Sequence, residues 1–338
     1  MTIEKNMLRE RAKKLPDVTQ EMWEQVDPLY KEAVEEFLQT AQLSKQSEKQ
    51  YISALKQFGW FIKNSATNKP FNKIKKCDAI RYINYLRVDR GMSSSGINLK
   101  KSAVSSLCQY VENYWVDDYT DENGDLIFET FRNFMQGLPP VLKTQTYNKV
   151  KITKDEYDLM MKTLESDEDY LGMAWLAVAF NVGARRSEIV QFKTSILSQE
   201  FSKGGYKKHS PIRGKGRGEE GKRLEYLFYP EALEYIELWI EKRGYDHEYI
   251  FTVGTKDSPR VMSPHWADYF CENTLSHILG RRINPHIFKA SCITYLLEQG
   301  VKMKIVSKYF AHHESTETTE IYNLSDDSEE LDNLEVDL

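Results

Sequence analysis

The chain has few cysteines, no long apolar run and no closely spaced metal ligands. Its four cysteines, Cys77, Cys108, Cys271 and Cys292, lie far apart and form no CxxC pair, which argues against a disulfide framework and against a zinc site. No stretch approaches the roughly 18 apolar residues that a membrane-spanning helix needs. The first 16 residues are charged, whereas a signal peptide is apolar. The sequence therefore predicts a protein of the cytosol that makes no contact with a membrane.

Cofactor-binding motifs are missing as well. None of His247, His265 and His277 has the spacing of metal ligands. Residues 216–222 read GxxxxGK, but Arg223 stands where a phosphate-binding loop carries the Ser or Thr that holds magnesium. We therefore expect neither a metal nor a cofactor.

Negative charge is concentrated at the C-terminal end. The formal net charge is −5, and the last 13 residues hold seven acidic side chains and no basic one. The remainder, with 46 basic and 44 acidic residues, carries a net charge of +2. Within it, residues 203–223 contain eight Lys or Arg against two Glu. Such a cluster is typical of surfaces that meet phosphates, and a solvated charged loop is the alternative.

Apolar residues recur at helical spacing along most of the chain. In the first part the pattern predicts helices at 27–43, 47–64 and 77–88, a fourth from the turn GMSSSG to Trp115, and a short one at 128–135. Residues 137–150 contain Gly, two Pro and polar side chains without periodicity, which is typical of an interdomain connection. The second part has helical patterns at 153–164, 170–181, 264–279, 285–299 and 302–310.

Between Ser210 and Tyr229, two short strand patterns flank a glycine-rich basic turn. The expected fold is therefore mainly α with a small β-hairpin. We divide the chain into an N-terminal helical extension (1–44), a helical domain (45–137), a linker (138–150), a mixed α+β domain (151–325) and an acidic tail (326–338).

Seven separated residues have side chains suited to phosphate chemistry. They are Arg185 in GARRSEI, Lys215 in IRGKGR, His286 and Lys289 in PHIFK, His312 and His313 in KYFAHH, and Tyr322 in ETTEIY. A phosphodiester gains charge on its non-bridging oxygens in the transition state, so fixed cations stabilise that state most. An Arg fork can contact two oxygens, a Lys can protonate a leaving oxygen, and a Tyr hydroxyl can attack phosphorus.

Each of these residues also has a plain structural interpretation. Arg185 can pair with Glu188 at a helix end, and His286 can be a helix-capping imidazole. Lys215 can be a simple contact to a phosphate backbone. Tyr322 can be an aromatic residue that packs the last helix. The order and separation of the seven residues favour the chemical interpretation.

Residues 170–323 resemble the catalytic domain of the tyrosine recombinases, the phage integrase family, and residues 45–140 resemble its helical core-binding domain. GARRSEI is similar to the first arginine box, PHIFKASCITYLLEQG to the His-x-x-Arg box, and KYFAHHESTETTEIY to the Leu-Gly-His segment before the nucleophile. The resemblance implies a tyrosine-recombinase fold, without metal or ATP, that cleaves and rejoins DNA strands through a 3′-phosphotyrosine at Tyr322. It also implies a bacterial mobile element or prophage as the source, with the protein at the host's nucleoid.

The resemblance further implies that both domains clamp a specific site on double-stranded DNA, with self-association there as a dimer or tetramer. Basic residues in both domains would meet the DNA backbone: Lys100, Lys101, Lys207, Lys208, Arg213 and Arg217. The acidic tail would either dock on a neighbouring protomer or repel DNA until binding displaces it.

Two departures from the family pattern leave a second function open. The second arginine is replaced by Lys289, a point charge where a bidentate fork is expected. The glycine of Leu-Gly-His is Ala311 when the residues are counted from KYFA, and this count selects His312, our first choice. Counting back nine residues from Tyr322 selects His313. The alternative function is a catalytically inactive, DNA-binding transcriptional repressor that controls phage lysogeny.

Overall fold

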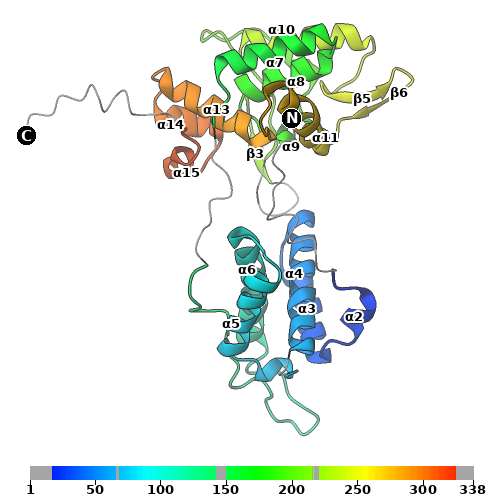
Figure 1. Cartoon of the computed structure of the whole chain (residues 1–338), viewed down its shortest axis with the longest axis vertical. Helices are drawn as coiled ribbons and strands as arrows, with labels where there is room; N and C mark the ends of the chain where they lie inside the picture. The colour runs from blue at the N-terminus through cyan, green and yellow to red at the C-terminus, as the bar shows by residue number, and fades with distance from the viewer. Residues whose placement is uncertain (1–16, 66–67, 142–149, 215, 217–220, 325–338) are drawn as a thin grey trace, which may run out of the picture. The chain divides into compact units, whose positions relative to one another are not determined.

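Figure 1 shows the computed structural model, which describes residues 17–65, 68–141, 150–214, 216 and 221–324. The described residues fall into two compact units: an N-terminal unit that ends at residue 141 and a C-terminal unit that begins at residue 150. Most of the expected linker, the acidic tail, Lys215 and Arg217 lie outside the described residues. Within the described ranges, no helix combines the length and apolar character needed to cross a membrane.

The N-terminal unit is helical. Its elements are α2 (Gln20–Glu24), α3 (Pro28–Thr40), α4 (Lys45–Asn64), the 3-10 turn η1 (Phe71–Lys73), α5 (Lys76–Asn84), the π-helical turn η2 (Tyr85–Asp89) and α6 (Ser94–Tyr114). Side-chain caps set the helix starts, because the first amides of a helix have no partner within it. Asp27 accepts from the amide of Leu29 at 3.1 Å, and Ser93 accepts from the amide of Gly96 at 3.3 Å.

Aromatic residues from several elements form the core of the N-terminal unit. Trp23 and Tyr30, from the first 44 residues, pack with Phe58 and Phe71. Gly59 of α4 allows this contact, because a Cβ atom there would lie 2.7 Å from the Tyr30 ring. Helices α2 and α3 are therefore part of this core.

The short helix expected at 128–135 is absent. That segment forms successive turns, although Phe128, Phe131, Phe134 and Met135 are buried in the same core. Buried side chains that recur every three residues in turns imitate helical spacing, so this prediction was wrong.

The C-terminal unit is helical with three small antiparallel strand pairs. Its helices are α7 (Lys154–Ser166), α8 (Tyr170–Asn181), α9 (Arg186–Ile189), α10 (Pro230–Arg243), α11 (Pro264–Phe270), α12 (Ser276–Leu279), α13 (Pro285–Glu298), α14 (Met303–Val306) and α15 (Thr316–Glu320), with turns η3 (Thr194–Ile196), η4 (Cys271–Leu275) and η5 (Ser307–Ala311). The strands are β1 (Lys207–Lys208), β2 (Ile212–Gly214), β3 (Lys222–Leu224), β4 (Leu227–Phe228), β5 (Thr252–Thr255) and β6 (Ser258–Val261), paired β1–β4, β2–β3 and β5–β6.

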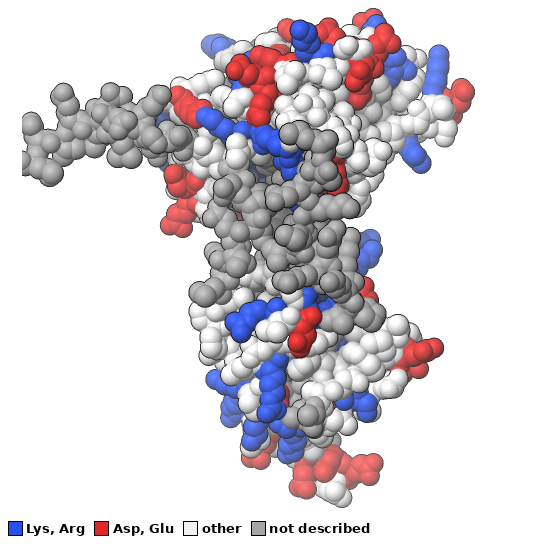
Figure 2. Space-filling model, viewed as in Figure 1, with Lys and Arg blue, Asp and Glu red and all other residues white. Residues whose placement is uncertain are grey.

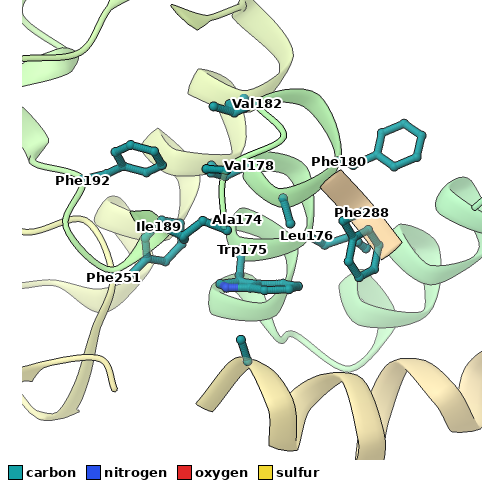
Figure 3. Packing of buried hydrophobic residues seen from close by; sticks show 14 of the residues in the cluster. Ala174, Trp175, Leu176, Val178, Phe180, Val182, Ile189, Phe192, Phe251 and Phe288 are labelled. Atoms are coloured by element: carbon teal, nitrogen blue, oxygen red, sulfur yellow. The ribbon is translucent and has the colours of Figure 1, made fainter. Parts of the chain in front are cut away.

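Helix α8 runs through the centre of this unit. Its residues from Gly172 to Phe180 are all buried, as expected for a helix without a polar face. Trp175 packs edge-on against Phe270 and Phe288, with ring centroids 5.7 Å apart in both pairs. Figure 3 shows Trp175 and Phe288 among the packed residues. The packed core fixes α13 against α8, and α9 follows α8 directly. Two segments that carry candidate site residues are thereby held by one core.

Candidate active site

Arg185 is the N-cap of α9 and is bound twice by Glu188. The backbone amide of Arg185 donates to Glu188 Oε2 at 2.7 Å, and Arg185 Nη1 donates to Oε1 at 2.9 Å. Glu188 is 1% exposed. Burial raises the pKa of its carboxyl, but the charges of Arg185 and Lys289, with the hydrogen bonds from Tyr226 and from the Arg185 amide, together outweigh burial and lower it. The Arg185–Glu188 pair anticipated as a structural interpretation is present, and it also fixes the guanidinium at the helix end.

Tyr226 also binds Glu188, a contact that the sequence analysis did not predict. Its hydroxyl donates to Glu188 Oε2 at 2.6 Å, and the side chain is buried. Burial and the nearby Glu188 raise the pKa of Tyr226, so the phenol stays protonated. Nothing in the spacing of Tyr226, two residues beyond β3, indicates this contact.

Lys289 lies on α13 and is fully buried. Its Nζ donates to the carbonyl oxygen of Gly183 at 3.1 Å. Burial, followed by repulsion from Arg185, lowers the pKa of Lys289 to about 7. At neutral pH this side chain is therefore only partly charged, and it supports the turn that precedes Arg185.

His286 lies at the first turn of α13, where Pro285 occupies the first helical position. Its amide donates to Asn284 Oδ1 at 3.1 Å, so Asn284 is the cap of this helix. Desolvation and the positive charges of Arg186, Arg185 and Lys289 lower the pKa of the His286 imidazole. The structure thus places His286 in the electrostatic range of the Arg185 and Lys289 cations.

His312 and His313 follow η5, and their backbone conformations differ. His312 has φ +51° and ends the helical turn in the left-handed conformation, which helices usually end with glycine. Ala311 is still helical and buried. His312 thus has the backbone conformation that a glycine often adopts at a helix end, and His313 is the residue that follows it.

The imidazoles of His312 and His313 each contact a tyrosine of the candidate site. The His312 ring meets Tyr226 edge-on at 4.5 Å between centroids, and the His313 ring lies 4.8 Å from the Tyr322 ring. His313 Nδ1 bonds to Thr319 Oγ1 at 3.0 Å. Burial and the charge of Lys289 lower the pKa of each histidine to about 4, so both are neutral at pH 7. Among the described groups, neither Nε2 atom has a hydrogen-bond partner, although both are buried.

Tyr322 is half-buried just beyond α15. Its amide donates to Thr319 O at 2.9 Å, and its carbonyl accepts from Thr294 Oγ1 at 3.4 Å. Its ring packs against a small cluster that contains Val306 and Ala311. The tyrosine is therefore held by packing, as the structural interpretation expected, and it also lies within electrostatic range of Arg185.

The base of the β2–β3 hairpin is bonded to the segment that follows α9 and to the loop that contains His313. Gln191, just after α9, accepts from the Arg213 amide at 3.0 Å and donates to the Arg213 carbonyl at 2.9 Å. Lys222 of β3 forms an ion pair with Glu314, which follows His313. In β2, Gly214 pairs with Lys222. The hairpin that carries Lys215 is thus anchored beside α9 and the histidine loop.

The basic residues expected to meet DNA divide into two groups. Lys100 and Lys207 are buried, and Lys207 Nζ donates to Leu197 O at 2.6 Å. Lys208 pairs with Glu225, whereas Arg213 is exposed and Lys101 is half-buried. Figure 2 shows that basic and acidic side chains are interspersed on the visible face of the C-terminal unit. The Lys207 side chain is therefore mostly buried, with its ammonium bonded to a backbone carbonyl.

Metal ligands do not assemble in the described ranges, where no three His, Cys, Asp or Glu side chains are grouped as a metal site would require.

Two family models match the chain. Residues 151–329 match the phage integrase family, and residues 30–118 match the N-terminal SAM-like domain of phage integrases. The chain belongs to the phage integrase family. Its fold is therefore that of the tyrosine recombinases, with the site described above on the matched C-terminal unit.

Curated and solved relatives agree with this family. The chain is 56% identical to the SPbeta prophage-derived recombinase-like protein YomM of Bacillus subtilis strain 168, over 97% of both chains. It is similar in fold to XerH site-specific recombinase bound to a palindromic difH substrate, with a TM-score of 0.63, 17% identity and coverage of 96% and 92% of the two chains. A lambda integrase dimer bound to a COC′ core site gives a TM-score of 0.62, 15% identity and coverage of 91% and 99%.

Proposed function

We propose that this integrase-family protein is a site-specific recombinase that cleaves DNA with Tyr322. The observation that supports this proposal most is the position of Tyr322, whose ring lies 4.8 Å from the His313 ring and within electrostatic range of Arg185. Glu188 holds the Arg185 guanidinium in a fixed orientation. A nucleophile, a neutral imidazole and a fixed cation are the groups that phosphoryl transfer to a tyrosine requires.

The proposed reaction forms one bond and breaks one. Tyr322 loses its phenolic proton and bonds to phosphorus, and the bond between phosphorus and the 5′ oxygen breaks. Arg185 stabilises the charge on the non-bridging oxygens. Lys215 would protonate the departing 5′ oxygen, and its role rests on the family resemblance. His286 and His313 would bind the phosphate or carry protons, since both lie beside the cations and His313 is neutral.

The proposed partner is double-stranded DNA, bound by both units, with self-association on the site. The support is the family match of both units and the DNA-bound states named for the XerH and lambda integrase structures. We propose Lys101, Lys208 and Arg213 as backbone contacts, together with Arg217. The relation to a prophage-derived protein supports a mobile element as the source and the host's cytosol as the location.

A DNA-binding regulator without cleavage activity is the second candidate, and one observation favours it. Lys289 replaces the family's second arginine, and it is fully buried against Gly183 O with a pKa of about 7. It therefore supplies neither a fork nor a full charge to a phosphate. Loss of one charge-assisted contact in a transition state costs about two to three decades in rate.

Covalent trapping separates the two candidates. The protein is incubated with its selected DNA site carrying a nick next to the cleavage position, so that the short 5′ fragment diffuses away and the adduct persists. A recombinase gives a protein–DNA adduct that disappears in Tyr322→Phe. Specific binding without an adduct, in the native chain and in Lys289→Arg, supports the regulator and overturns the recombinase proposal.

A further inference from the structure

Arg186 is a second arginine directly beside Arg185. It occupies the first position of α9, and Arg185 is the cap of that helix. The Arg186 side chain is 33% exposed, and that of Arg185 is 19% exposed. An arginine is ionised at any ordinary pH, and its planar fork carries five N–H donors. The start of α9 therefore carries two permanent cations, of which the proposed reaction uses only one.

Arg186 lies near His286. Desolvation, and then the charge of Arg186 ahead of those of Arg185 and Lys289, lowers the pKa of the His286 imidazole. Of the charges that act on this imidazole, that of Arg186 has the largest effect. The His286 side chain is accessible at the first turn of α13. A phosphate bound between Arg185 and His286 would therefore lie within electrostatic range of Arg186 as well.

Asp268 of α11 orients the Arg186 side chain. Arg186 Nη1 forms an ion pair with Asp268 Oδ2, and His265 Nδ1 lies 3.5 Å from the same oxygen. The Asp268 side chain is 43% exposed, and an ion pair between accessible side chains contributes little to stability. Because a guanidinium has five donors, this pair can orient Arg186 while other donors bind a second anion.

Lys289 does not supply the second fork that the family resemblance leads us to expect. Its side chain is fully buried, and its Nζ is bonded to Gly183 O at 3.1 Å. An ammonium that supports a backbone turn inside the protein cannot also grip two phosphate oxygens. Another cation near Arg185 must then stabilise the charge of the transition state. Among the described residues, Arg186 meets this requirement.

We infer that Arg186 is a further catalytic residue, which binds the reacting phosphate beside Arg185 and His286 and takes the role of the second arginine. The inference rests on the proposed function, because this phosphate belongs to the DNA strand that Tyr322 attacks. Asp268 then acts as a positioning residue that keeps the guanidinium oriented before DNA binds. With Arg186 in this role, a lysine at position 289 is compatible with cleavage.

Single-turnover cleavage tests this role. The protein, at saturating concentration, is mixed with the nicked duplex, and the rate of adduct formation is followed. Arg186→Met should lower this rate about 100-fold, because one charge-assisted contact to the transition state is lost. Arg186→Lys should lower it roughly tenfold, because the charge remains and the fork is lost.

Asp268→Asn is the matched control, since it removes the same ion pair and keeps Arg186. Its cleavage rate should stay within about threefold of the native rate, and both Asp268→Asn and Arg186→Met should have a Tm close to that of the native chain. A native rate in Arg186→Met would overturn the inference and leave the proposed function standing. Equal losses in Arg186→Met and Asp268→Asn would also overturn it, because Arg186 would then act only through its ion pair.

DNA binding tests the same contact without cleavage. In the Tyr322→Phe background, Kd is measured for the normal duplex and for a duplex in which a neutral methylphosphonate replaces the reacting phosphate. Arg186→Met should raise Kd about tenfold on the normal duplex and less than about threefold on the neutral one, where the partner charge is absent. Arg260→Met, which changes an exposed arginine of β6, should alter Kd by the same factor on both. Equal weakening of both duplexes by Arg186→Met would overturn the inference.

The two measurements separate this inference from the proposed function. If the native chain forms no adduct but Arg186→Met distinguishes the two duplexes, cleavage fails and the contact between Arg186 and the phosphate stands. If the native chain binds no DNA, both are overturned. Should Arg186→Met not fold, Arg186→Lys gives the same comparisons with smaller factors, and a native rate together with equal Kd changes on both duplexes would overturn the inference.

Discussion

Replacing Lys289 with Met should change how the stability of the protein depends on pH. Lys289 is fully buried, and its pKa in the folded protein is about 7 against an ordinary value of 10.5. Below pH 7 the folded state must keep a buried ammonium. Between these two values the unfolded chain binds a proton that the folded state has released. The free energy of unfolding therefore rises with pH in this window.

The magnitude follows from the two pKa values. At about 1.4 kcal/mol per pKa unit, Lys289 should contribute about 3 kcal/mol of increasing stability between pH 6.5 and 9.5. Lys289→Met removes this dependence and leaves Gly183 O without its donor, which costs about 1 to 3 kcal/mol at every pH. The variant should therefore be more stable than the native chain at pH 6.5, and its advantage should vanish or reverse by pH 9.5.

The assay is urea unfolding of both proteins at four pH values across this window. Because other titrating groups, including Lys100, are the same in both proteins, their contributions largely cancel in the difference. A difference in unfolding free energy that stays constant from pH 6.5 to 9.5 would refute the account of Lys289.

Three further substitutions test other contacts. Tyr226→Phe removes the donor to Glu188 and should lower the unfolding free energy, measured by urea unfolding, by about 1 to 3 kcal/mol. It should also reduce the yield of trapped adduct. An unchanged adduct yield would count against the positioning of Arg185 through Glu188. Gly59→Ala places a Cβ 2.7 Å from Tyr30 and should lower Tm by overpacking worth about 1 to 3 kcal/mol, and a native Tm would contradict that contact. Ser93→Ala removes the cap of α6 and should cost about 1 kcal/mol in thermal unfolding, whereas no cost would show that the cap is dispensable.

Helical periodicity predicted most of the helices because it reports which face is buried. The expected helix at 47–64 corresponds to α4 (Lys45–Asn64), and the one at 170–181 to α8 (Tyr170–Asn181). Helix α10 (Pro230–Arg243) was missed, although Pro230 at its first position and Gly244 at its end are ordinary helix signals.

The strand pairs and the buried charges could not be read from local sequence. The strands are two to four residues long, too short for an alternating pattern to emerge. Burial of Lys289 and Lys100 depends on which elements pack around them, and a lysine in the sequence gives no sign of this. The left-handed backbone at His312 likewise follows from where the helical turn ends, which residue counting could not decide.

Mapping the modified residue in a trapped protein–DNA adduct tests the central claim most directly. The adduct formed on nicked DNA is digested with protease and nuclease, and the peptide that carries a nucleotide is identified by mass. The account predicts one modified peptide, with the phosphate bonded to Tyr322 and absent in Tyr322→Phe. Specific DNA binding with no modified peptide, or modification of another of the twenty tyrosines, would contradict it.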